Sequence, residues 1–256
     1  MKQFRLLDPK FPDLSARSLC ALAVMTKAPQ PGRLKTRLVP PLTPEEAAEL
    51  NKRFLRDTTA AISSACSRRP AGDVNVSRSE PATAACGIAV YTPVGAESAY
   101  TDILPTAFSL LPQRGDKFGE RLYFAVKDLF KCGFGSVCLI DSDSPTVPAA
   151  NFEEAVELLS TTEDRVVLGP SDDGGYYLIG MKKPHRHLFE QIDWSTERVL
   201  NQTMQRATEI GIEVKLLPTG YDVDDDASLR RLCNELLADT TASDIAPQRG
   251  NFSRGW

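Results

Sequence analysis

The stretch "SLCALAVMTK" (residues 18–27) decides the fold class of this chain. Its apolar residues run on without alternation, which predicts a strand that is buried on both faces. Strands of this kind belong to parallel sheets, where helices connect one strand to the next. After a turn-rich loop, "TPEEAAELNKRFLRDTTAAISSAC" (43–66) has the apolar spacing of an amphipathic helix. Thr43 and Glu46 form the pattern of a capping box, with Pro44 at the first helical position.

The same order of strand and helix continues along the chain. Strand patterns recur at 86–93, 108–113, 136–143, 164–170, 175–181 and 212–218, and helical patterns recur at 120–132, 151–160, 195–211 and 226–238. This alternation predicts an α/β fold, a three-layer α/β/α sandwich with a mainly parallel central sheet. We expect one domain over residues 18–238, with an N-terminal extension at 1–17, a surface insertion at 68–85 and a polar C-terminal tail at 239–256.

Composition excludes several classes of function. The chain has 256 residues and a net charge of −4, so it has no basic excess with which to hold a nucleic-acid backbone. The two histidines, His185 and His187, are too few for a histidine-rich metal site and make a Ser-His-Asp triad unlikely to form. The six cysteines form no CxxC pair, and we interpret them as reduced core thiols.

No segment approaches the roughly 20 consecutive apolar residues of a membrane span. Residues 1–17 carry charges and prolines throughout and lack the apolar centre of a secretory signal. We therefore expect a cytoplasmic protein, and the sequence does not indicate an oligomeric state.

In open α/β sheets, ligands bind at the carboxyl ends of the strands, so the functional residues are expected in the loops that follow the strands. The first is "KAPQPGRLKTRL" (27–38), in which Gly32 shapes the turn. Its cations are Lys27, Arg33, Lys35 and Arg37. Backbone N–H groups and cations in such a loop can hold phosphates, and a solvated basic turn is the alternative.

The second loop is "LPQRGDKFGERL" (111–122). Gly115 and Gly119 allow a nucleotide to approach the backbone closely, and Gln113 offers both a donor and an acceptor to a base edge. Arg121 is either a phosphate contact or a member of a surface ion pair.

The third loop is "CLIDSDSPTVP" (138–148), where Asp141 and Asp143 follow an apolar run. Two carboxylates this close repel one another unless a proton or a cation lies between them, and Mg²⁺ prefers oxygen ligands. The alternative is that one or both aspartates cap the following turn.

The fourth loop, "TGYDVDDDASLRRL" (219–232), brings four further aspartates, at 222, 224, 225 and 226. Asp225 or Asp226 is expected to cap the following helix, since acidic residues are common there. The remaining aspartates are then available as a second protein ligand for a metal ion.

Between these loops lies "GPSDDGGYYLIG" (169–180), which predicts either a plain hairpin turn or part of an acceptor pocket. Its candidate acceptor-binding residues are Asp173, Gly174, Gly175 and Tyr176. Further on, Trp194 is interpreted as a core contact, followed by Ser195 as the cap of a helix.

Five ordered motifs resemble the nucleotide-diphospho-sugar transferase superfamily, whose fold is called GT-A. They are "KAPQPGRLKTRL", "GDKFGER", "SDSP", "DGGYYLIG" and "DVDD", and the resemblance runs from Lys27 to Leu232. The chain is most similar to a bacterial group of uncharacterised glycosyltransferase-like proteins. Its first loop is also similar to that of phospholactate guanylyltransferases and, more distantly, molybdenum-cofactor guanylyltransferases, although "PQPG" replaces their Gly-x-Gly turn.

The resemblance implies a transferase that uses an activated nucleotide with Mg²⁺ or Mn²⁺. Asp143 and Asp224 would hold the ion, with Asp141 assisting although many relatives have glycine there, and Lys35 would approach the phosphates. One version is glycosyl transfer from an NDP-sugar to a small-molecule acceptor, which the label of the group favours. The other is nucleotidylyl transfer from an NTP to a phosphorylated small molecule with release of pyrophosphate. A nucleotide-binding module without turnover is a third reading.

Overall fold

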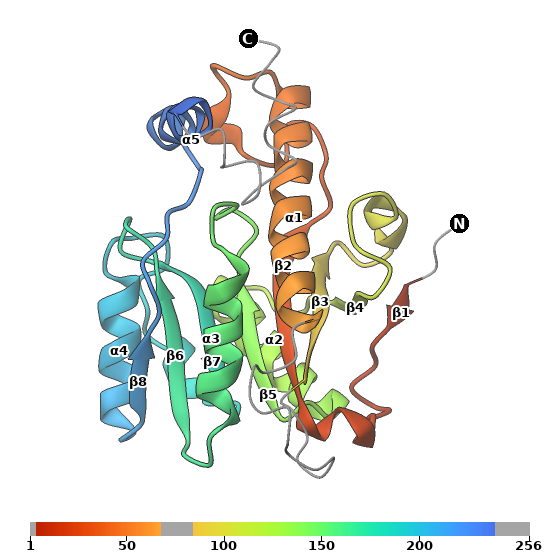
Figure 1. Ribbon diagram of the computed structural model, residues 1–256, viewed down its shortest axis with the longest axis vertical. Coiled ribbons are helices and arrows are strands. Elements are labelled where there is room, and N and C mark those ends of the chain that lie inside the picture. Colours follow the sequence, from red (N-terminus) through yellow and green to blue (C-terminus); the bar gives the residue numbers. More distant parts are fainter. Residues whose placement is uncertain (1–3, 68–83, 239–256) are drawn as a thin grey trace, which may run out of the picture.

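The computed structural model describes residues 4–67 and 84–238, and within them it contains one eight-stranded sheet (Figure 1). The strands are β1 (Arg5–Leu6), β2 (Leu19–Lys27), β3 (Ala84–Thr92), β4 (Ser109–Pro112), β5 (Ser136–Ile140), β6 (Arg165–Pro170), β7 (Tyr176–Met181) and β8 (Glu213–Leu216). Their order in the sheet is β1–β4–β3–β2–β5–β7–β6–β8. β7 is antiparallel to β5 and β6, and the other neighbouring strands pair in parallel, so the predicted mainly parallel sheet is confirmed.

Helices cover both faces of the sheet and complete the predicted three layers. α1 (Pro44–Ser67) and α3 (Ala149–Ser160) pack on one face, and α2 (Phe118–Cys132) and α4 (Val199–Glu209) lie on the other. Short 3-10 helices occur at η1 (Leu14–Ser18), η2 (Thr36–Leu38), η3 (Glu97–Tyr100) and η4 (Arg186–Phe189). Each face of the sheet has its own apolar core, because the buried strands point alternate side chains to opposite sides.

β2 lies at the centre, as its continuous apolar run predicts. Residues 20–24 are completely buried, and the strand pairs with β3 on one side and β5 on the other. The chain passes from β2 to β3 and β4 on one side and then returns to β5 on the other. This reversal opens a crevice at the carboxyl ends of β2 and β5, which is where open α/β sheets bind ligands.

The predicted capping box starts α1. The backbone N–H of Thr43 donates to Glu46 Oε2 at 2.8 Å, and the N–H of Glu46 donates to Thr43 Oγ1 at 3.2 Å. The last helix, α5 (Asp226–Ala238), lies at the same end of the molecule as the start of α1 (Figure 1). A third apolar cluster, which includes Phe54 and Leu232, joins α5 to α1 and fixes the fourth loop over the carboxyl ends of the strands.

The largest differences from the predicted boundaries are three, and β3 also begins at Ala84, inside the insertion predicted at 68–85. The segment expected to be an N-terminal extension contributes β1, which pairs with β4 at the edge of the sheet. β5 ends at Ile140, so Asp141 and Asp143 lie in the loop after it. α4 begins at Val199 and not at residue 195, because the backbone of Ser195 has a left-handed φ of 64° that a helix cannot contain.

Residues 68–83 of the predicted insertion and the predicted tail at 239–256 lie outside the described residues. Among the helices that the structure does describe, none combines the length and apolar character needed to cross a membrane.

Candidate active site

Lys35 joins two of the predicted loops at the carboxyl edge of the sheet. Its ammonium lies 2.6 Å from Asp143 Oδ1 and 2.7 Å from Asp224 Oδ1, and it also donates to the carbonyl oxygen of Val223 at 2.8 Å. Arg37 adds a second cation to Asp224, at 2.7 Å from Oδ2. Residues that the sequence predicted as phosphate and metal ligands thus meet at one point.

The environment keeps Lys35 charged. Its side chain is only 4% exposed, and its ammonium lies 5.4 Å from the centre of the Phe54 ring. Burial on its own would lower the pKa of Lys35, but the attraction and hydrogen bonds of Asp143 and Asp224 outweigh burial and raise that pKa above its ordinary value.

Asp141 belongs to a different network from Asp143. Its Oδ1 accepts hydrogen bonds from the backbone N–H groups of Asp143 and Ser144, both at 3.2 Å, so it caps the turn after β5. Ser144 Oγ lies 2.9 Å from Asp141 Oδ2 and 2.7 Å from Asp222 Oδ1, and Ser171 donates to the same Asp222 oxygen at 2.9 Å. Asp141 is therefore a turn cap tied to Asp222, whereas Asp143 and Asp224 form the ion pairs with Lys35.

Asp141 and Asp222 form a half-buried acidic pair, bridged by Ser144. Burial, followed by the charges of Asp222 and Asp143, raises the pKa of Asp141 well above its usual range. Burial also raises the pKa of Asp222, although hydrogen bonds from Ser144 and Ser171 oppose that rise. No cation in the described part of the chain forms an ion pair with either carboxylate, so this pair carries charge that a ligand can neutralise.

A basic pocket of about 360 Å³ lies on one side of the Asp143–Lys35–Asp224 contact. Its charged and polar lining includes Lys27, Arg33, Lys35, Arg37, Gln113 and Arg121, all of which the sequence predicted to bind the nucleotide. Lys27, Arg33 and Arg121 have no ion-pair partner within the described residues, and Arg121 Nε is buried without a hydrogen-bond partner. Unpaired cations around a cavity are suited to a bound anion.

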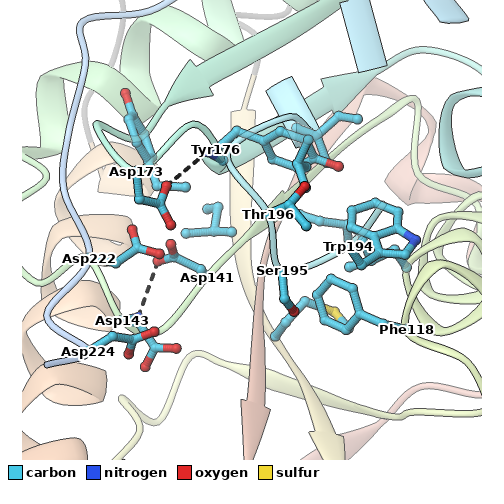
Figure 2. A pocket seen from close by; sticks show the side chains of 18 of the residues that line it. Phe118, Asp141, Asp143, Asp173, Tyr176, Trp194, Ser195, Thr196, Asp222 and Asp224 are labelled. Atoms are coloured by element: carbon cyan, nitrogen blue, oxygen red, sulfur yellow. Dashed lines mark hydrogen bonds between the residues drawn. The ribbon is translucent and has the colours of Figure 1, made fainter. Parts of the chain in front are cut away.

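An acidic pocket of about 490 Å³ lies on the other side of the same contact (Figure 2). Five aspartates line it, namely Asp141, Asp143, Asp173, Asp222 and Asp224. Figure 2 shows these carboxylates on one side, facing Phe118 and Trp194 across the pocket. Asp143 and Asp224 line both pockets, so a ligand could extend from one into the other across this carboxylate pair.

Trp194 packs against the apolar core on this face of the sheet, as predicted, and it also forms part of the pocket wall. It is half-buried, and its ring meets Phe118 edge-on with the ring centres 5.1 Å apart. A signal for this position was present in the sequence. A helix that leads into a parallel strand starts at the carboxyl edge of the sheet, so the residues just before α4 had to lie near the site.

The predicted glycines lie near the site but shape its backbone. Gly32, Gly115 and Gly174 have left-handed φ values of 71°, 106° and 88°. Gly119 faces Trp194, because a Cβ there would lie 2.7 Å from Trp194 Nε1. Of the four predicted acceptor-binding residues, Asp173, Gly175 and Tyr176 line the acidic pocket. In the described structure Gly32, Gly115, Gly119 and Gly174 line neither pocket.

Two further sequence assignments are refined by hydrogen bonds. The Gln113 amide nitrogen donates to the carbonyl oxygens of Thr26 and Val90, at 3.1 and 2.7 Å, so its carbonyl oxygen is the group left for a ligand. Asp225 Oδ1 accepts from the N–H of Ser228 at 2.8 Å and caps α5, as predicted for Asp225 or Asp226.

Two carboxylates at the junction are candidate ligands for the expected divalent ion. Within residues 4–67 and 84–238, no three side chains of His, Cys, Asp or Glu are grouped to hold a metal. However, Mg²⁺ is usually held by one or two carboxylates together with substrate phosphates. One oxygen each of Asp143 and Asp224 already converges on a single cation, the Lys35 ammonium, so this pair fits such an ion.

Comparison with known proteins identifies the fold. Residues 80–196 match a family model described as uncharacterized proteins conserved in bacteria, DUF2064. No curated protein shows significant sequence similarity to the chain. A candidate nucleotide-diphospho-sugar transferase from Desulfovibrio desulfuricans G20 has a similar structure, with a TM-score of 0.73 and 24% identity over 93% of this chain and 97% of that one.

A synthase and a synthetase are more distant structural neighbours. The 4-diphosphocytidyl-2C-methyl-D-erythritol synthase of Anaerococcus prevotii has a TM-score of 0.52 and 12% identity, over 89% of this chain and all of that one. CMP:2-keto-3-deoxy-manno-octonic acid synthetase, solved with CTP, has a TM-score of 0.50 and 12% identity, over 86% and 98%. The chain therefore has the nucleotide-diphospho-sugar transferase fold, as its motifs implied.

Proposed function

We propose that the protein is a metal-dependent transferase that uses an activated nucleotide, and that it transfers a glycosyl group from an NDP-sugar to a small-molecule acceptor. The observation that carries this proposal is the junction of a basic and an acidic pocket at Asp143, Lys35 and Asp224. A substrate that crosses this junction would have its phosphates on one side and a group rich in hydrogen-bond donors on the other.

The basic pocket accounts for the nucleotide diphosphate. Lys27, Arg33 and Arg121 are free of ion pairs within the described chain, and each can form charge-assisted hydrogen bonds with phosphate oxygens. A Mg²⁺ or Mn²⁺ ion held by Asp143 and Asp224 would neutralise the diphosphate as it leaves. The solved neighbours include a synthetase in complex with CTP, which is consistent with nucleotide binding by a protein of this fold.

The acidic pocket favours glycosyl transfer. Asp141 and Asp222 lack cationic partners in the described structure, so the group that binds beside them is neutral or cationic and not phosphorylated. Hydroxyl groups of a sugar or polyol donate to carboxylates, and aromatic rings such as those of Phe118 and Trp194 offer an apolar surface to ring C–H groups. The acceptor oxygen would attack the anomeric carbon, the bond from that carbon to the diphosphate would break, and an adjacent carboxylate would take the acceptor's proton.

Nucleotidylyl transfer is the second candidate, and the basic pocket is the observation in its favour. Its lining carries five cationic side chains, which also suits the larger charge of a triphosphate. In that reaction an acceptor phosphate would attack the α-phosphate of an NTP, and pyrophosphate would leave. Such an acceptor would place its own negative charge next to the acidic pair, which is why we prefer glycosyl transfer.

Product analysis separates the two reactions. We would incubate the protein with Mn²⁺ and a panel of NDP-sugars and NTPs, and follow the products by phosphorus NMR. Release of an NDP from an NDP-sugar, with sugar passed to water or to an added polyol, is the expected result, whereas pyrophosphate from an NTP would contradict glycosyl transfer. Asp143→Asn should abolish the product. Asp164→Asn is the matched control, since Asp164 also pairs with a lysine, at 3.0 Å, but precedes β6 at the opposite edge of the sheet.

A further inference from the structure

The Lys35 ammonium occupies the point at which the expected metal ligands converge. It has three N–H donors, and three oxygens, from Asp143, Asp224 and Val223, lie 2.6 to 2.8 Å from its nitrogen. The side chain is almost fully buried and rests near the Phe54 ring. An ammonium in this position places a positive charge at contact distance from both carboxylates, as a small metal cation would.

The backbone around Lys35 is held in an unusual conformation. Lys35 has a φ of 48° and a ψ of 37°, which is the left-handed region that residues other than glycine rarely adopt. Gly32, three residues earlier, also has a positive φ and has no atom within 4 Å of where a side chain would begin. The contacts of the ammonium therefore help to hold Lys35 in a backbone conformation that its own preference disfavours.

We infer that Lys35 is a built-in competitor of the divalent cation, which keeps Asp143 and Asp224 closed to a free ion until phosphates draw the ammonium away. This inference rests on the proposed function, since it takes those two aspartates as the metal ligands. A metal ion and an ammonium that shared Asp143 Oδ1 and Asp224 Oδ1 at contact distance would repel one another. An ion that takes both of these oxygens is therefore favoured when Lys35 moves away from them, and Lys35 also lines the basic pocket, where phosphates would give it a new anionic partner.

The inference predicts that metal and nucleotide bind with positive coupling. Each ligand favours binding of the other. Phosphates that pair with the Lys35 ammonium leave Asp143 and Asp224 free for the metal, and a metal bound to these aspartates leaves the ammonium free to pair with phosphates. Coupling of this kind is reciprocal, and typical values change affinity by about 5- to 150-fold. The free protein would thus hold a divalent ion weakly although its ligands are preformed.

The test measures Mn²⁺ alone, without nucleotide, by titration followed with electron paramagnetic resonance. Wild type should bind Mn²⁺ weakly, and Lys35→Met should bind it about tenfold or more tightly. Lys27→Met is the matched control, because Lys27 lines the same pocket but contacts neither aspartate. The double variant Lys35→Met with Asp143→Asn should lose the added affinity.

Thermal unfolding gives a second readout that remains informative if Lys35→Met is less stable. Mn²⁺ alone should raise the Tm of Lys35→Met and leave that of wild type nearly unchanged. Equal Mn²⁺ affinity in wild type and Lys35→Met would overturn the inference. An equal increase of Mn²⁺ affinity in Lys27→Met would also overturn it, because the increase would then be a general effect of removing a positive charge. If nucleotide binding needs Mn²⁺ and Asp143 but Lys35→Met gains nothing, only the role of Lys35 fails. If nucleotide binding needs neither, the proposed function itself fails.

Discussion

At the scale of single residues, Asp141 and Asp143 have different roles although one residue separates them. Asp143 faces the Lys35 ammonium, whereas Asp141 caps a turn and meets Asp222 through Ser144. The Ser144 hydroxyl has one hydrogen, yet its oxygen lies within 2.9 Å of one carboxylate and 2.7 Å of the other. A proton on Asp141 that is donated to Ser144 satisfies both contacts, in agreement with the raised pKa of Asp141.

Asp141→Asn should therefore stabilise the protein at neutral pH. The pKa of Asp141 is raised by folding, so between about pH 4 and its folded pKa the native state binds more protons than the unfolded state, and stability falls as pH rises. Asparagine does not ionise, and its NH₂ can donate to Ser144 as the protonated acid does. We expect a Tm about 2 to 4 °C above wild type at pH 7.5, with the gain vanishing near pH 4. Thermal scans across this pH range would measure it.

Asp143→Asn is the control two residues away. It removes one partner of a nearly buried ammonium, so it should lower the Tm at pH 7.5. A Tm for Asp141→Asn at or below that of wild type at every pH would contradict the assignment of the proton to Asp141.

At the scale of elements, the wall of the acidic pocket depends on how the loop before α4 packs on the start of α2. Trp194 comes from that loop, Phe118 begins α2, and Gly119 provides the space in which the two segments meet. The shape of the pocket thus depends on the absence of a side chain at Gly119.

Gly119→Ala should disturb this wall. The added Cβ would lie 2.7 Å from Trp194 Nε1 and 2.8 Å from the carbonyl oxygen of Phe189, and the latter is backbone that cannot rotate away. Overpacking of this kind typically costs about 1 to 3 kcal/mol, which outweighs the better helix propensity of alanine. We expect a lower Tm, a red shift of Trp194 emission measured in a Trp256→Phe background, and reduced release of NDP.

Lys131→Ala, at an exposed site in the last turn of the same helix, is the control and should leave all three readouts near wild type. A Gly119→Ala variant with unchanged Tm and emission would show that the contact with Trp194 does not define the pocket.

At the scale of the whole molecule, the sequence was sufficient to predict the mainly parallel sheet and to propose one edge of it as the candidate site. Continuous apolar runs such as residues 18–27 indicate buried parallel strands, and the carboxyl ends of parallel strands meet at one edge, so the loops could be brought together without coordinates. β1 could not be foreseen, because two residues carry no periodic pattern and their pairing with β4 is a tertiary contact.

The finer structure of the site depends on contacts across long sequence separations. Lys35 lies 189 positions before Asp224, and no local pattern indicates that its ammonium would lie between two aspartates and not free in the basic pocket. Likewise, Asp141 and Asp143 belong to separate networks because β5 ends at Ile140 and both residues lie in the loop after it. An apolar sequence pattern does not locate the end of a strand to within one residue.

The most direct test of the account is whether nucleotide binding requires both a divalent ion and Asp143. The measurement is the Tm of wild type and of Asp143→Asn with a panel of nucleoside diphosphates, each with and without Mn²⁺. A ligand at 100 times its Kd stabilises by about 2.7 kcal/mol, so for wild type at least one nucleotide should raise the Tm by about 5 to 10 °C, with Mn²⁺ only. The shift should be absent in Asp143→Asn. No shift with any nucleotide, or an equal shift in Asp143→Asn or without Mn²⁺, would contradict the account.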